Sequence, residues 1–268
     1  MTIAPIQTPD SSAIATAFVS ARLSQTATRD YPGVLPTAMS QSYAIQDEAI
    51  GLFPDTIIGW KVGGVPPPQQ AALGIHRLAG PIFARNHWMD GPANQLPVIE
   101  GGFAAVEAEF IARIGADADP AKLDWTVEEA MDQVDAVFIG IELAGSPLSA
   151  INDLGSAIVA SDFGNNGGLL VGQALDDWRE RMNDITVETI IDGVSVGTGG
   201  ALSLAGGAME SVRFLLEHCA QRGRPLTQGI LVSTGAVTGV HRVYAGSSWS
   251  CDFQGVGLIK GETVPATA

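Results

Sequence analysis

The feature that most constrains the fold of this chain is a set of acidic residues within apolar strands. Glu142 lies in residues 138–143, a run that otherwise contains only apolar residues and one glycine. Residues 103–114 predict an earlier strand, and there Glu107 and Glu109 are two positions apart. Side chains at this spacing point to the same face of a strand. A carboxylate buried alone is costly or takes up a proton, so the three side chains need partners.

Two interpretations of these glutamates are open. In the first, a helix over residues 126–137 returns the chain, the strand over 137–143 comes to lie beside the strand over 103–114, and the carboxylates share one hard cation. Ligation by oxygen alone favours Mg²⁺, Mn²⁺ or Ca²⁺ over Zn²⁺. In the second, Glu107 and Glu109 lie on a solvated sheet face and Glu142 caps another element. The apolar surroundings of Glu142 favour the first interpretation.

Lys61 is the second unusual charge. It is one of only three lysines, and it lies in an apolar strand predicted over residues 56–62, directly before Gly63 and Gly64. A buried lysine either has an anionic partner or acquires a lowered pKa and carries protons. The alternative is an ammonium that reaches water from the end of the strand. Lys61 is therefore a candidate catalytic residue.

A third candidate is the loop predicted over residues 161–168, which is rich in Asp, Asn and Gly. Such a composition suits a loop whose backbone closely approaches a ligand. An ordinary surface turn has the same composition, so both interpretations stay open. We take Asp162, Asn165 and Gly63 as candidate substrate-binding residues.

The composition narrows the class of protein. The chain has 29 acidic and 14 basic residues, a net charge of −15, so a nucleic acid partner is not expected. No apolar run reaches the roughly 18 residues of a membrane span. The first 12 residues lack the basic start and apolar stretch of a signal peptide. With only two cysteines, the sequence predicts a cytoplasmic protein without a disulfide framework.

The predicted elements give an α+β protein. Helices are expected over residues 11–29, 37–52 and 209–221, a hairpin over 185–197, and strands over 229–237 and 249–259. Residues 80–102, rich in Gly, Pro and Asn, are expected to be loops with one short strand. We expect a helical N-terminal part (1–78) packed on a β-rich catalytic body (79–268). No long linker separates them, so they should form one structural domain.

Six short segments together resemble the 2-keto-4-pentenoate hydratase and 4-oxalocrotonate decarboxylase family, within the fumarylacetoacetate hydrolase superfamily. In order, they are residues 59–64 (GWKVGG), 72–75 (ALGI), 106–110 (VEAEF), 141–148 (IELAGSPL), 161–172 (SDFGNNGGLLVG) and 231–239 (LVSTGAVTG). The set is specific, although no single segment is. The resemblance covers about residues 40–260.

The resemblance implies a mixed β-sandwich roll with a helical N-terminal part, assembled into homo-oligomers. It also implies that Glu107, Glu109 and Glu142 hold Mg²⁺ or Mn²⁺ and that Lys61 lines the active site. The implied substrate is a small 2-oxo acid or dienoate.

The first implied activity is hydration of a 2-hydroxy-2,4-dienoate in aromatic catabolism. The alternatives are decarboxylation of a 4-oxalocrotonate-like diacid, hydrolysis of an acylpyruvate C–C bond, and a non-catalytic partner subunit. Hydratases of the family often have an aspartate after the L-G-[IV] segment. Here the corresponding stretch, residues 80–83, has the sequence Gly-Pro-Ile-Phe and contains no acid.

Overall fold

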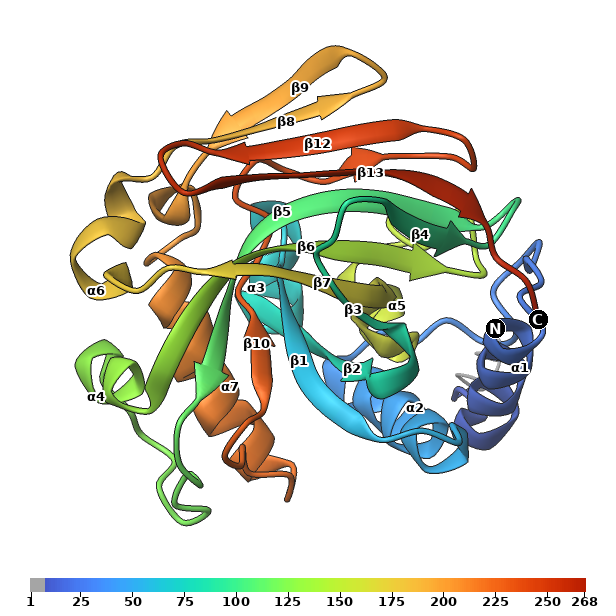
Figure 1. Ribbon diagram of the computed structural model, residues 1–268. Helices are drawn as coiled ribbons and strands as arrows, with labels where there is room; N and C mark the ends of the chain where they lie inside the picture. Colours follow the sequence, from blue (N-terminus) through green and yellow to red (C-terminus); the bar gives the residue numbers. More distant parts are fainter. Residues whose placement is uncertain (1–7) are drawn as a thin grey trace.

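The structure, a computed structural model, describes residues 8–268 and contains two β-sheets (Figure 1). The strands of the large sheet are β1 (Ile57–Gly64), β2 (Arg77–Phe83), β3 (His87–Met89), β5 (Phe103–Ile114), β6 (Val134–Ser146), β7 (Asn166–Ala174), β10 (Leu231–Ser233) and β11 (His241–Arg242). Their order is β2-β1-β10-β5-β6-β7-β3, and β11 also pairs with β5. The small sheet contains β4 (Asn94–Val98), β8 (Val187–Ile191), β9 (Val194–Gly199), β12 (Ser248–Phe253) and β13 (Gly257–Pro265), in the order β4-β13-β12-β8-β9.

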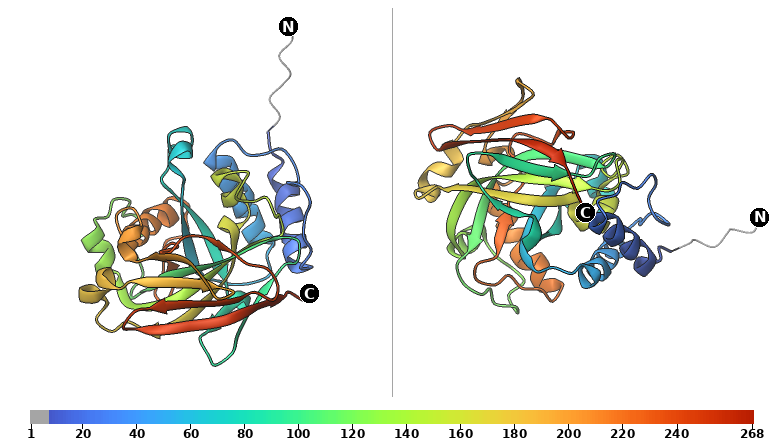
Figure 2. Two further views of the ribbon diagram at one scale, coloured as in Figure 1. Left: turned by 90° about the horizontal axis from the view of Figure 1, so that it is seen from above. Right: turned by 45° about the vertical axis from the view of Figure 1, so that its right-hand side comes forward.

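The helices form two groups beside the sheets. They are α1 (Ser11–Leu23), α2 (Met39–Leu52), α3 (Pro67–Leu73), α4 (Val127–Asp132), α5 (Ser156–Ser161), α6 (Trp178–Arg181) and α7 (Ala208–Gln221). Figures 1 and 2 show α1 and α2 together on one side of the molecule and α4 and α7 on the other. The left view of Figure 2 shows α3 projecting from the end of β1 and β2.

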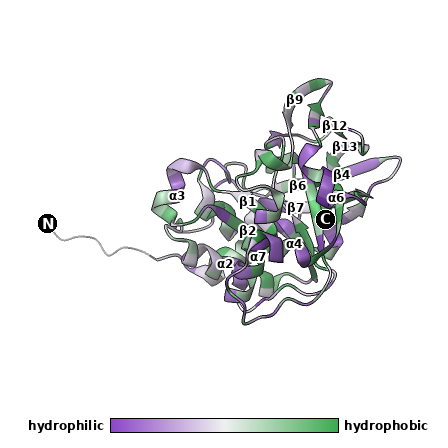
Figure 3. Ribbon diagram, turned by 90° about the vertical axis from the view of Figure 1, so that its left-hand side faces the viewer, coloured by the Kyte–Doolittle hydropathy of each residue, from purple (hydrophilic) through white to green (hydrophobic). Residues whose placement is uncertain are grey.

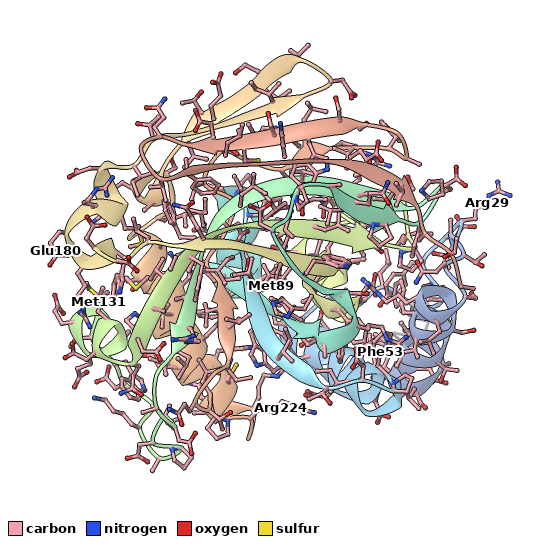
Figure 4. All side chains as sticks on the ribbon, viewed as in Figure 1. Arg29, Phe53, Met89, Met131, Glu180 and Arg224 are labelled. Atoms are coloured by element: carbon pink, nitrogen blue, oxygen red, sulfur yellow. The ribbon has the colours of Figure 1, made fainter. Side chains whose placement is uncertain are left out.

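Two apolar clusters hold the sheets and helices together. Between the sheets, the rings of Phe110 on β5 and Phe253 on β12 meet edge to face, with their centroids 5.6 Å apart. Beside the large sheet, Phe53 (labelled in Figure 4) packs against Phe83 and Phe163, with centroids 4.4 and 5.5 Å away. The second cluster contains the buried faces of α1, α2 and α5, so it attaches the N-terminal helices to the sheet.

The expected fold class is confirmed in its coarse form, since residues 8–268 form a mixed α/β protein with two sheets and seven α-helices. Both the sandwich-roll description and the division at residue 78 stay predictions. β1 lies before that position and pairs within the large sheet.

Within residues 8–268, no helix combines the length and hydropathy of a bilayer span, and Figure 3 shows hydrophilic and hydrophobic residues along the helices. The first 12 residues are not expected to form a signal peptide, and residues 1–7 of that segment lie outside the described residues.

The prediction of loops over residues 80–102 was wrong, because most of β2 and all of β3 and β4 lie there. Pro81 in β2 and Pro97 in β4 favoured loops, since proline cannot donate a backbone hydrogen bond. Both strands are at the edge of their sheets, where that donor is not needed. The position of a strand within its sheet is a tertiary property that the local sequence does not show.

Other predicted bounds also need correction. Residues 249–259 form two strands, β12 and β13, joined by a turn in which Gly255 has φ 72°. The strand predicted over 229–237 is limited to β10. The helix predicted over 126–137 ends at Asp132, because Val134 already pairs with Ile114 in the large sheet. The helix predicted over 11–29 ends at Leu23.

A substitution at Gly80 tests how tightly β2 packs against the turn that follows α5. A Cβ at this position would overlap the backbone carbonyl of Phe163 and lie 2.8 Å from Gly164 Cα. We expect Gly80→Ala to lower the free energy of unfolding by about 1–3 kcal/mol, measured by urea denaturation. The control is Gly64→Ala on the paired strand, where no atom lies within 4 Å of the new Cβ. Equal stability of the two variants would contradict this packing.

Candidate active site

Three glutamates meet at the centre of the large sheet. Glu107 and Glu109 lie on β5, and Glu142 lies on β6 directly opposite Glu107 in the antiparallel register. Each residue offers one carboxylate oxygen, and these oxygens all lie within 4.8 Å of one another. The three side chains are buried. The structure therefore brings together the residues that the sequence suggested as metal ligands.

The hydrogen bonds around two of these carboxylates are asymmetric. Glu109 Oε2 accepts hydrogen bonds from Ser233 Oγ at 2.6 Å and from the Gly235 backbone N–H at 2.7 Å. Glu142 Oε1 accepts one from Asn166 Nδ2 at 3.0 Å. Among residues 8–268, the other oxygen of Glu109, Oε1, is buried and has no hydrogen-bond partner, and the other oxygen of Glu142, Oε2, is buried and lies 3.4 Å from Lys61 Nζ. One oxygen of each carboxylate is thus held in place while the other is left for a ligand.

The charges of the cluster also favour a cation. In the metal-free protein, burial and then the charge of Glu142 raise the pKa of Glu107 to about 8. The same two causes raise the pKa of Glu109 well above its ordinary value. Lys61 is the one basic group that lowers either pKa, and it does not balance three carboxylates. A divalent cation would bring the net charge of the group to zero, and three carboxylate oxygens are the donors that Mg²⁺ and Mn²⁺ prefer. The residues present therefore fit such an ion.

Lys61 lies beside the cluster on β1. Its Nζ is 3.4 Å from Glu142 Oε2, and its side chain is only 6% exposed. Burial alone lowers the pKa of Lys61. The charges of the three glutamates, with Glu142 foremost, outweigh burial and raise the pKa above its ordinary value. Of the two interpretations of Lys61, the structure matches the buried ammonium with an anionic partner.

A cavity of about 600 Å³ adjoins the cluster, and Lys61, Gly63, Glu107 and Asn165 line it. A Cβ at Gly63 would lie 3.5 Å from Lys61 Nζ, so the glycine leaves space beside the ammonium. Further polar residues also line the cavity, and no motif of the sequence marks them as a site. They include Gln69 and Gln70 of α3, together with His76, Arg77, Asn152 and Thr234.

Asp162 does not line this cavity. Its Oδ1 is 2.6 Å from Arg22 Nε, and its Oδ2 accepts a hydrogen bond from Ser146 Oγ at 2.6 Å. Asn165 does line the cavity, and its buried Oδ1 has no hydrogen-bond partner in the described part of the chain. The two candidate residues of the 161–168 segment therefore differ: Asp162 is bound within the protein, and Asn165 faces the space that a ligand would fill.

The backbone between these two residues is strained. Phe163, Gly164 and Asn165 have φ values of 52°, 64° and 62°, three consecutive residues in the left-handed region. A residue other than glycine in this region costs about 1–3 kcal/mol. Packing of Phe163 against Phe53 and Phe83 and the bonds of Asp162 offset this cost. Strain of this kind is typical of segments that place a functional side chain.

Metal binding should depend on pH in a defined direction. The pKa of Glu107 is raised on folding from 4.5 to about 8 without metal. A raised acid pKa contributes stability that is fully present below about pH 4.5 and is lost as the pH rises through about 8. Bound Mg²⁺ requires the deprotonated carboxylates. We therefore expect the increase in Tm caused by Mg²⁺, relative to EDTA, to grow across this pH range.

The measurement is differential scanning fluorimetry at several pH values, with and without the metal. Glu107→Gln, which removes this titrating ligand, is the control and should flatten the dependence. An increase in Tm that is equal at both ends of the range would contradict metal binding by these carboxylates.

No family model matches the chain, but the chain is similar to known proteins in sequence and in fold. The chain is 25% identical over 210 residues to a 2-keto-4-pentenoate hydratase of Paraburkholderia xenovorans (strain LB400), covering 77% of this chain and 76% of the relative. Its fold is similar to that of a 4-oxalocrotonate decarboxylase from Pseudomonas putida G7 complexed with magnesium and adipate. The TM-score is 0.78 at 18% identity, over 95% of this chain and 97% of that one.

A third similarity is to a fumarylpyruvate hydrolase from Pseudomonas aeruginosa in complex with Mn²⁺ and pyruvate. The TM-score is 0.57 at 16% identity, over 77% of this chain and 89% of the other. The solved structures show a shared fold, and the hydratase shows a sequence relationship over three quarters of the chain. The resemblance inferred from the motifs is thereby confirmed: the chain is similar in sequence to a 2-keto-4-pentenoate hydratase and similar in fold to a 4-oxalocrotonate decarboxylase and a fumarylpyruvate hydrolase.

Proposed function

We propose that this protein is a lyase that depends on Mg²⁺ or Mn²⁺ and adds water to a 2-hydroxy-2,4-dienoate or 2-oxo-enoate. The observation that carries the proposal is the group of three buried carboxylates, each with one oxygen within 4.8 Å of the others, beside the ammonium of Lys61. Relatives named as hydratases support the reaction class. We also propose a role in aromatic catabolism. The cytoplasmic location and the homo-oligomer stay predictions.

The three glutamates would hold the cation, and their surroundings are of two kinds. Glu109 and Glu142 are fixed by hydrogen bonds and are fully buried, whereas Glu107 faces the cavity. A cation held there would act as a Lewis acid toward a 2-oxo acid and stabilise negative charge that develops on the oxo oxygen. When water adds at the far carbon of the conjugated chain, the electron pair of the double bond moves to the oxo oxygen, so stabilising charge there would favour the addition.

Lys61 and Asn165 are the groups of the chain placed to handle the substrate. Hydration puts a hydroxyl on one carbon and a proton on another, so a proton must be moved at the site. The Lys61 ammonium faces the cavity and can bind the substrate carboxylate. The charges of the three glutamates raise its pKa, and a bound cation that offsets them would let Lys61 transfer that proton. The Asn165 amide, with its unpartnered Oδ1, can bind a polar group of the substrate.

Decarboxylation is the second candidate, and one observation favours it. Residues 80–83 have the sequence Gly-Pro-Ile-Phe, and Ile82 is fully buried in an apolar cluster. This stretch therefore provides no acid for water activation where hydratases of the family often have one. Loss of CO₂ from a 4-oxalocrotonate-like diacid would use the same stabilised negative charge and needs no activated water.

One spectrophotometric screen separates these candidates. The isolated protein is mixed with 2-hydroxydienoates or 4-oxalocrotonate, with Mg²⁺ or Mn²⁺, and both dienol absorbance and CO₂ are followed. Loss of absorbance without CO₂ supports the hydratase. Release of CO₂ supports the decarboxylase instead. If no substrate is turned over with either metal, the lyase proposal is wrong, and a non-catalytic partner subunit is favoured.

Replacing Lys61 tests its proposed part in the reaction. We expect Lys61→Met to lower kcat by about 100-fold, the usual contribution of a proton-transferring group. Mg²⁺ binding, measured by calorimetry, should persist because the three carboxylates remain. Lys122→Met is the control, since Lys122 lies in an ion pair with Glu129 away from the cavity. A Lys61→Met enzyme with the wild-type kcat would exclude Lys61 from the chemistry.

The left-handed backbone of Asn165 allows a second test. Glycine adopts a φ of 62° without strain, so Asn165→Gly removes the amide and keeps the turn. We expect kcat/KM to fall by about 10-fold, the effect of one lost hydrogen bond, with Tm unchanged or higher. The control is Asp192→Gly in the β8–β9 turn, where φ is 49°. If both variants keep the wild-type kcat/KM, Asn165 does not bind substrate.

A further inference from the structure

A buried arginine on the N-terminal helix α1 is connected to the glutamate cluster through one asparagine. Arg22 is 8% exposed and donates three close hydrogen bonds. They go to Asp162 Oδ1 at 2.6 Å, to the Asn166 backbone carbonyl at 2.8 Å and to the Gly145 carbonyl at 2.8 Å. Arg22 therefore binds the two sides of the left-handed turn, with Asp162 before it and Asn166 after it.

Asn166 continues this connection to Glu142. Its backbone carbonyl accepts from Arg22, and its side-chain Nδ2 donates to Glu142 Oε1. The pairing of β6 with β7 shifts register between Leu143 and Ala144, a local irregularity next to Asn166. Such irregularities re-aim side chains within a sheet. Here the Asn166 amide reaches the carboxylate two positions away from its own pairing partner.

This hydrogen bond decides which oxygen of Glu142 is free. Because Oε1 accepts the Asn166 hydrogen bond, Oε2 is the oxygen left for a cation, and Lys61 Nζ lies 3.4 Å from it. Groups that bind a metal ligand from behind set its orientation and tune the affinity of the site. Neither Arg22 nor Asn166 lines the cavity, so neither is placed to touch the substrate.

We propose that Asn166 and Arg22 are positioning residues of the metal site: Arg22 fixes the Asn166 backbone, and the Asn166 amide orients Glu142 toward the cation. This inference rests on the proposed function, because it assumes that Glu142 is a metal ligand. It assigns part of the metal affinity to the N-terminal helix, which contributes no ligand of its own. The shortest connection, through Asn166, consists of two hydrogen bonds.

Asn166→Ala tests the last step of this connection. We expect the Kd for Mg²⁺, measured by titration calorimetry on the full chain, to rise by about 10-fold or more. The matched control is Asn94→Ala. Asn94 is also buried, and its Nδ2 also donates to a carboxylate, Asp90 Oδ1 at 2.7 Å, but it lies on β4 in the small sheet. Tm in EDTA is recorded for both variants, and only Asn166→Ala should change the Kd.

Arg22→Lys tests the earlier step and remains informative if Asn166→Ala does not fold. Lysine keeps the positive charge beside Asp162 but lacks the planar fork that binds several acceptors at once. We expect a smaller rise in Kd than for Asn166→Ala. Arg22 pairs with Asp162 and stacks on Phe163, and Arg85 likewise pairs with Asp55 and stacks on Phe53, so Arg85→Lys is the control. It should leave the Kd unchanged.

The double variant Arg22→Lys/Asn166→Ala decides whether the two residues act in series. If they do, the Kd of the double variant equals that of Asn166→Ala alone, because the amide that transmits the effect is already absent. A wild-type Kd in both single variants, or independent additive effects, would overturn the inference while leaving the metal site in place. A wild-type protein that binds no Mg²⁺ would instead refute the proposed function itself.

Discussion

Mutual repulsion among three buried carboxylates is the constraint on which much of this structure depends. One ammonium, on Lys61, lies within ion-pair distance of the group. Hydrogen-bond donors must therefore come from elsewhere in the chain. The segment after β10 leaves the sheet so that the Gly235 N–H reaches Glu109, and the left-handed turn before β7 brings Asn166 to Glu142. Several irregular features of the large sheet are thus explained by one electrostatic requirement.

The parts of the fold that the sequence predicted correctly are those controlled by local periodicity. The two-residue spacing of Glu107 and Glu109 gave their shared face, and the apolar run around Glu142 indicated burial beside them. The β8–β9 hairpin followed from its Asp-Gly turn. The strands with internal proline were missed, because Pro81 and Pro97 are acceptable only at a sheet edge, and edge position depends on the whole topology.

The supporting residues of the site could not be predicted for a related reason. Ser233, Gly235 and Asn166 are small or polar residues in glycine-rich segments, and nothing in their local sequence distinguishes a carboxylate donor from a turn residue. Composition alone makes Asp162 a substrate-binding candidate. Its partner Arg22 lies 140 residues earlier in the chain. Long-range pairs of this kind leave no periodic pattern in the sequence.

The cavity has a floor, formed by the glutamate cluster and Lys61, and a rim of exposed residues, and the two belong to different kinds of structure. The three glutamates and Lys61 lie on interior strands of the sheet, where a change in one residue disturbs several neighbours. His76, Asn152 and Ala205 at the rim are exposed and lie on loops. Substitutions in exposed loops usually change stability little. During divergence, such a protein can therefore accept new substrates through changes at the rim while the chemistry of the floor is inherited intact.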